Sequence, residues 1–203
     1  MKKYIYYLKA SLWICYILFS LSCCTSKTNP ILNQMVPMLS EDYCRIAVLP
    51  FLNESHYKQG DIILQKVFTA ELIKAGDYSI AQEGDILKLY QQIKIYSGHS
   101  PDYEQLRIIA DRLNVQLLIT GRIIEMNENL VNLSVNPELA LSVQIFDAKT
   151  GTILWTTYHR KNGEQYRTLL HFGKINSITT LAQIMTQEVI EKWISEGFKK
   201  CTH

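Results

Sequence analysis

Apolar residues recur along this chain at two different spacings, one typical of helices and one typical of strands. Helical spacing places apolar positions three and four residues apart, so that they share one face. It predicts helices over residues 59–75, 85–93, 102–114 and 178–196. Gly76 and Gly197 follow the first and the last of these segments, where glycine commonly ends a helix.

Strand-like patterns lie between the predicted helices. The apolar run at residues 45–50 closes on Pro50, which lacks the N–H that a strand needs to continue. A short strand is expected at 78–82. A longer one at 115–126 is apolar on both faces at its start, as in the centre of a sheet. Gly121 within it indicates a bulge or a close backbone approach.

The second half of the chain predicts a hairpin. Alternating apolar positions at 139–146 and 153–157 flank a short turn that ends in Gly151. Asp147 and Thr150 are interpreted as turn residues, because their side chains accept or exchange hydrogen bonds with nearby backbone. Trp155 is expected in the core. The Asn-rich segment 127–137 is expected to be a loop, although its apolar residues alternate briefly.

Taken in order, these elements predict an α/β (α+β) fold. We expect a mixed β-sheet of about five strands with helices packed on it, ending in a β-hairpin and a long C-terminal helix. The folded domain is expected at 43–203, preceded by a flexible, polar and Pro-containing tether at 24–42.

Residues 1–23 have the pattern of a secretory signal peptide. Basic residues open the chain, and the apolar run at 10–21 is too short to span a bilayer, which takes roughly 20 residues. The run ends on Ser22-Cys23-Cys24, which resembles the lipobox of bacterial lipoproteins. Cys24 is the preferred lipidation site because Leu21 precedes it by three, and Cys23 is the alternative because small Ser22 precedes it. An uncleaved signal anchor or an ordinary exported protein also stays open.

Lipidation would fix the chain to a membrane. Several acyl chains such as palmitate hold a protein on a bilayer firmly, whereas a single chain does not. Whichever cysteine is the first mature residue, the residue after it is not Asp. Asp at that second mature position is the retention signal of inner-membrane lipoproteins in enterobacteria. We therefore expect an outer-membrane anchor with the domain facing the periplasm.

Charge and cysteine content fit such an exported protein. The net charge of +2 gives no general attraction to nucleic acid. Cys44 precedes the first predicted strand and Cys201 follows the last predicted helix, so in an oxidising compartment they are a candidate disulfide. Two free thiols fit the sequence equally well.

Three segments resemble the periplasmic domain of the curli-secretion lipoprotein CsgG. They are IAVLPFLN at 46–53, ADRLNVQLLITGR at 110–122 and IFDAKTGTILW at 145–155. The same fold type occurs in the N-terminal domain of TolB and in lipoprotein activators of penicillin-binding proteins. Gln116 stands where the family often has Asp. The resemblance implies a non-enzymatic domain that serves secretion, assembly or synthase regulation through an envelope protein partner.

One feature of the curli channel is not expected here. A membrane-spanning strand needs about 9–11 alternating residues, and the channel inserts hairpins of that kind. The connections at 51–58, 96–101 and 127–137 are too short to hold two such strands. The chain is therefore interpreted as the water-facing domain without the pore. A homo-oligomeric, ring-shaped export complex remains the alternative.

No motif predicts catalysis. Phosphate-binding glycine loops, zinc-ligand clusters and the Gly-x-Ser-x-Gly elbow are missing from the sequence, so no catalytic residue, metal site or cofactor is predicted. A hydrolase that uses a Ser/His/Asp triad at the strand ends stays open, because triads are assembled in space. His159 is expected at an outward or edge position of the last strand.

Two loops are candidates for contact with a partner. Asn53 and Glu54 follow the first strand, in a position where loops often carry function. Residues 164–168, together with Phe172, form either a docking segment or a loop packed by its own aromatic residues, Tyr166 and Phe172. The packed loop is the favoured interpretation.

Overall fold

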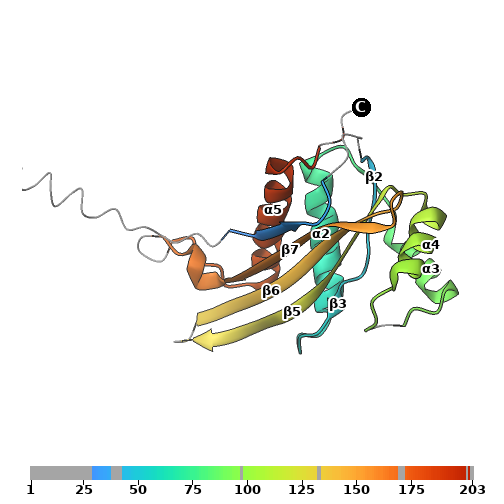
Figure 1. Ribbon diagram of the computed structural model, residues 1–203. Helices are drawn as coiled ribbons and strands as arrows, with labels where there is room; N and C mark the ends of the chain where they lie inside the picture. The colour runs from blue at the N-terminus through green and yellow to red at the C-terminus, as the bar shows by residue number, and fades with distance from the viewer. Residues whose placement is uncertain are drawn as a thin grey trace, which may run out of the picture.

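The computed structural model describes residues 29–37, 43–96, 98–131, 134–168, 172–199 and 201. The predicted signal peptide and both lipobox cysteines, Cys23 and Cys24, lie outside these residues. The described chain forms one mixed sheet flanked by helices (Figure 1), which confirms the predicted fold class. The sheet has 7 strands rather than about five.

The elements are bounded as follows. The strands are β1 (Ile31–Gln34), β2 (Arg45–Val48), β3 (Leu52–Asn53), β4 (Ser79–Ile80), β5 (Leu117–Val131), β6 (Ser134–Asp147) and β7 (Thr152–Asn162). The helices are α2 (Gly60–Ala75), α3 (Glu83–Gln92), α4 (Tyr103–Leu113) and α5 (Ile178–Ser195), with a 3-10 turn η1 (Gly163–Tyr166).

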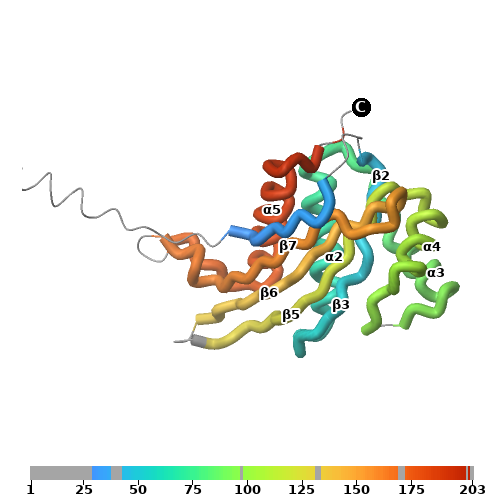
Figure 2. The backbone as a smooth tube through the Cα atoms, viewed as in Figure 1, coloured from blue at the N-terminus to red at the C-terminus, as the bar shows by residue number. Residues whose placement is uncertain are grey.

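The sheet is parallel at one side and antiparallel at the other. Its strand order is β1-β7-β6-β5-β2-β4, and β3 pairs with β5 beside this path. Strand β2 runs parallel to both β4 and β5. From β5 onward, β6, β7 and β1 are added antiparallel (Figure 2). The predicted hairpin is the β6–β7 pair, and β5 extends it into a three-stranded meander.

Helices cover the two faces unequally. Helices α2 and α5 pack together on one face, where Phe68, Trp155 and Trp193 belong to the larger core. Helices α3 and α4 pack on the other face near β2, over a smaller core that includes Leu118 and Phe146 (Figure 1). None of the helices in the described ranges has the length and apolar character needed to cross a bilayer.

Two sequence-based expectations are wrong for particular segments. Residues 31–34 lie in the expected tether, but they form β1, which pairs with β7 from Ile31–Tyr158 to Gln34–Trp155. Within the expected loop at 127–137, residues 127–131 instead continue β5 and residues 134–137 belong to β6, and the two strands pair as far as Val131 and Ser134. Asn has low strand propensity, and here register along a long antiparallel ladder overrides it.

Gly121 lies where the sequence predicts a close approach. A Cβ at this position would be 2.5 Å from the backbone oxygen of Ser142 and 2.7 Å from the Phe51 ring. The prediction of close approach is therefore confirmed. The bulge of β5 lies further on, between Ile123 and Glu125.

Candidate interaction surface

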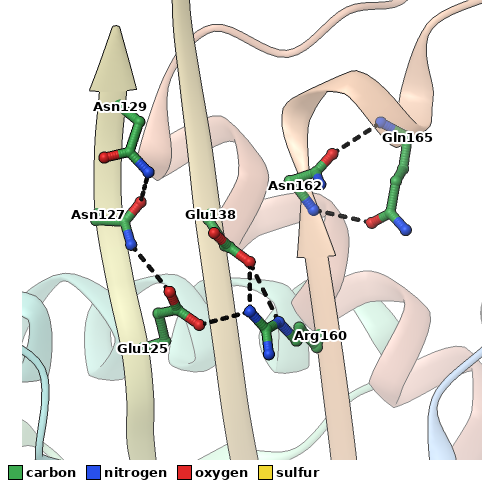
Figure 3. Close-up of polar contacts among 7 residues, drawn as sticks. All are labelled: Glu125, Asn127, Asn129, Glu138, Arg160, Asn162 and Gln165. Carbon is green, nitrogen blue, oxygen red and sulfur yellow. Dashed lines mark hydrogen bonds and ion pairs between the residues drawn. The ribbon is translucent and has the colours of Figure 1, made fainter. Parts of the chain in front are cut away.

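The three-stranded meander of β5, β6 and β7 extends past the part of the sheet that α3 and α4 cover. On that same side, the extended part of the meander exposes polar side chains. The bulge in β5 turns Ile123 and Met126 into the core, so Glu125, Asn127 and Asn129 share the opposite face. Glu138 of β6 and Arg160 of β7 lie beside them (Figure 3). We call this the open sheet face, made of Arg122, Glu125, Asn127, Asn129, Glu138, Arg160 and Asn162.

Arg160 connects three strands on the open sheet face. Its Nη2 lies 2.9 Å from Glu125 Oε2 and 2.7 Å from Glu138 Oε1, and its Nε donates to Glu138 at 3.2 Å (Figure 3). The hydrogen bonds with Glu138 and the charges of both carboxylates raise the pKa of Arg160. The Arg160 side chain is thus held in place, yet it stays 54% exposed and accessible.

Amide side chains extend this network toward the hairpin tip. Asn129 Nδ2 donates to Asn127 Oδ1 at 2.9 Å, and Asn127 Nδ2 donates to Glu125 Oε1 at 3.2 Å (Figure 3). At the end of β7, Asn162 and Gln165 exchange hydrogen bonds between side chain and backbone and start η1. The result is a row of ordered polar groups, which suits a macromolecular contact better than a small-molecule pocket.

The structure separates the two predicted loop residues. Asn53 serves its own loop, because its Nδ2 donates to the Tyr57 carbonyl and its Oδ1 accepts from Ser55. Glu54 instead accepts a 2.9 Å hydrogen bond from Arg122 Nη1, at the edge of the open sheet face. A contact role for these two residues stays a prediction, and the geometry favours Glu54.

His159 is buried, so its predicted outward position is wrong. Strand alternation places His159 on the same face as Trp155 and Thr157, against α5, where it is 1% exposed. Its Nε2 lies 2.5 Å from Glu188 Oε2, and the Tyr166 hydroxyl donates to the same oxygen at 3.0 Å. The sequence does contain a signal for this position, because alternation continued from Trp155 through Thr157 puts His159 on the buried face of β7.

This cluster connects β7 and η1 to α5. Burial alone would raise the pKa of Glu188, but hydrogen bonds from His159 and Tyr166, with the charges of His159 and Lys161, hold it below its ordinary value. Burial and the Glu188 carboxylate raise the pKa of Tyr166. The Glu188 carboxylate is thus kept ionised where it connects α5 to β7 and η1, which is a structural role.

At the ends of strands β5 and β6, the polar side chains bind nearby turn and backbone groups. Asp147 Oδ1 accepts from the Lys149 N–H at 2.8 Å, and Thr150 Oγ1 donates to Asp147 Oδ2 at 3.1 Å. The interpretation of both as turn residues is confirmed. Gln116 Oε1 accepts from the backbone N–H groups of Cys44 and Arg45, so the amide can do what a carboxylate would do there. The adjoining surface cleft measures about 530 Å³.

Cys44 and Cys201 form a disulfide in the structure, with their Cα atoms 5.2 Å apart. The bond joins the segment before β2 to the segment after α5. Around it, the Tyr78 hydroxyl donates to the Lys199 carbonyl, and the Asp77 N–H donates to the Cys201 carbonyl. The C-terminal segment is thereby attached to the parallel side of the sheet.

Comparison with known proteins finds the same fold in solved structures. No family model and no curated protein sequence matches the chain. Solved structures share the fold at low sequence identity, and they include a lipoprotein.

PelC and GNA1162 are two examples of these structures. The PelC dodecamer from Paraburkholderia phytofirmans has a TM-score of 0.55 and 12% identity, over 79% of this chain and 94% of PelC. Lipoprotein GNA1162 from Neisseria meningitidis has a TM-score of 0.53 and 17% identity, over 75% of this chain and 99% of that protein. At these identities the similarity establishes the fold alone.

Proposed function

We propose that this chain is a membrane-anchored periplasmic lipoprotein whose domain is a non-enzymatic interaction or assembly module of the cell envelope. The fold that it shares with lipoprotein GNA1162, over nearly all of that protein, is the observation that carries the proposal. The lipobox-like sequence at Ser22-Cys23-Cys24 is consistent with it. The proposed roles remain those of CsgG-like domains, namely secretion, assembly or synthase regulation.

The anchor is tested by metabolic labelling with palmitate. If Cys24 is the lipidated residue, label enters the wild-type protein and the Cys23→Ala variant but not the Cys24→Ala variant. Incorporation into none of the three proteins contradicts the lipoprotein assignment. Fractionation of the labelled protein on a sucrose gradient then distinguishes outer from inner membrane.

The open sheet face is the surface proposed to bind the envelope protein partner. Arginine is over-represented at interface hot spots, and Arg160 is ordered by two carboxylates while remaining accessible. The experiment is crosslinking in intact cells, followed by purification of the full-length protein. Arg160→Gln is compared with Arg112→Gln, a change of the same kind at an exposed arginine on α4.

Arg160→Gln is expected to reduce partner recovery about tenfold, which corresponds to a loss of roughly 1.4 kcal/mol of binding free energy. Arg112→Gln is expected to leave recovery unchanged. Equal recovery in the two variants contradicts the choice of surface. Reproducible recovery of no protein by the wild type contradicts the interaction function itself.

A ring-shaped assembly is the second candidate, and the PelC dodecamer is the observation that favours it. In a ring, each copy contacts the next through two different surfaces, and the rotation closes. Light scattering of the purified protein at high concentration tests this candidate. A monomer across the whole concentration range contradicts it.

A further inference from the structure

The polypeptide enters the fold at one end of the sheet. Asn29 and Ile31 line the same shallow cavity as Asn162 and Gln165, so β1 begins beside η1. Figure 2 shows the blue start of β1 next to the orange segment that follows β7. The end of the β5–β6 hairpin belongs to the same end of the molecule, because the Glu164 N–H donates to Asn136 Oδ1.

This end, which we call the entry end, exposes large apolar side chains from three separate elements. Phe172 follows η1 and is 72% exposed, Leu130 near the tip of β5 is 76% exposed, and Ile31 at the start of β1 is 60% exposed. Single exposed apolar residues are ordinary on protein surfaces. Three at the end where the chain enters suggest a common apolar environment.

The backbone around Phe172 is held by hydrogen bonds. Thr168 binds the Phe172 carbonyl twice, from its N–H at 2.6 Å and from its hydroxyl at 2.8 Å. Gly173 follows with φ +80, a conformation that favours glycine. Tyr166, by contrast, turns inward to Glu188. The expectation that both aromatic residues pack the loop is therefore right for Tyr166 and wrong for Phe172.

The stretch of chain between Cys24 and the fold is short, and its length limits how far the entry end can lie from a lipid anchor. Asn29 follows Cys24 by five residues, and five residues span at most about 18 Å when fully extended. Given the proposed lipid anchor at Cys24, on which this inference depends, Asn29 at the entry end cannot lie further than that from the bilayer surface. The short connection thus keeps the entry end close to the membrane.

We propose that the entry end rests against the lipid surface, with Phe172 and Leu130 inserted at the boundary between headgroups and acyl chains. Phe and Leu are typical of the apolar side of protein segments bound at this boundary. The lipid chains hold the protein on the membrane, and the inserted side chains fix its orientation. The parallel side of the sheet, with α3 and α4, then points away from the membrane.

The test measures lipid contact at Phe172 in the full-length lipidated protein. Phe172→Cys and Tyr96→Cys variants are labelled with a small fluorophore and placed in vesicles of phosphatidylethanolamine and phosphatidylglycerol, with or without nitroxide-labelled lipid. Tyr96 is the matched control: it is an aromatic residue, 69% exposed, that comes shortly after the end of α3. Helix α3 lies on the opposite side of the molecule from the blue start of β1 (Figure 1). Labelled protein without either substitution gives the background, and thermal melting verifies that both variants fold.

Nitroxide lipid is expected to reduce emission at position 172 about threefold and to leave position 96 nearly unchanged, as contact at the interface requires. Equal quenching at the two positions, or none at 172 while the protein floats with the vesicles, overturns this inference alone. Dimers crosslinked through position 172 also overturn it, in favour of a second copy as the occupant. Failure of the protein to float with vesicles overturns both this inference and the proposed anchor.

Discussion

Trp193 of α5 donates its indole N–H to the hydroxyl of Thr157 in β7, at 2.6 Å, and both side chains are fully buried. This bond connects the C-terminal helix to the strand that also carries His159 and Arg160. It lies at the centre of an aromatic cluster in which Trp193 contacts Phe68 and Phe198.

Thr157→Val should destabilise the domain by about 1–3 kcal/mol, because it keeps the shape of the side chain but leaves a buried N–H without its acceptor. Thr186→Val is the matched control. In the described part of the chain the Thr186 hydroxyl is buried without a hydrogen-bond partner, so its removal should cost nothing or stabilise slightly. Urea unfolding of both variants measures the difference, and equal losses would contradict the assigned bond.

Reduction of the Cys44–Cys201 bond should lower the free energy of unfolding by about 2–5 kcal/mol, because the bridge closes a very long loop in the unfolded chain. Unfolding with and without dithiothreitol measures this loss. The Cys44→Ser/Cys201→Ser double variant should match the reduced wild type and should not respond to dithiothreitol. Two thiols that titrate freely in the untreated native protein would contradict the bond.

Glu188→Gln should destabilise the domain by about 1–3 kcal/mol at neutral pH, because it weakens the hydrogen bonds with His159 and Tyr166. The pKa of Glu188 is lowered in the folded state, so its ionisation contributes stability fully at pH above the ordinary value of 4.5. That contribution is lost as the pH falls through the lowered native pKa.

The stability difference between wild type and Glu188→Gln should therefore be constant near neutrality and shrink in strong acid. Urea unfolding at a series of pH values measures it. A difference that grows as the pH falls would contradict the assigned charge state of Glu188.

Gly121→Ala should destabilise the domain by about 1–3 kcal/mol, since the new methyl group would meet the Ser142 carbonyl and the Phe51 ring. Gly84→Ala, in the first turn of α3, is the control, because nothing lies within 4 Å of its added Cβ. It should be neutral or stabilise by up to about 1 kcal/mol. Thermal unfolding of both variants gives the sign of each change in stability. A Gly121→Ala variant as stable as the wild type would show that β5 and β6 move apart easily.

Elements with long, regular patterns could be predicted from the sequence. Leu181, Met185 and Val189 mark the buried side of α5, and all three are buried in the structure. Strand β1 could not be predicted, because it has four residues and its partner β7 lies far away in the sequence. Short edge strands take their stability from the pairing partner and so leave little pattern of their own.

The open sheet face was missed for a related reason. Glu125 and Arg160 meet only through the register of three strands, and the bulge after Ile123 shifts which residues face outward. A strict alternation through 115–126 would have placed Glu125 in the core. The hydrogen-bond register that decides this is a tertiary property and is not readable from local residue types.

The position of β1 bears on how recombinant versions of this protein should be made. A version that begins at Tyr43, where the sequence places the start of the domain, lacks the strand that covers β7 and bares its backbone N–H and C=O groups. Bare edges of this kind pair with one another. A dimer or aggregate of such a shortened protein would not distinguish this artificial pairing from a native assembly, so oligomeric state should be measured on versions that retain Asn29 and the residues that follow it.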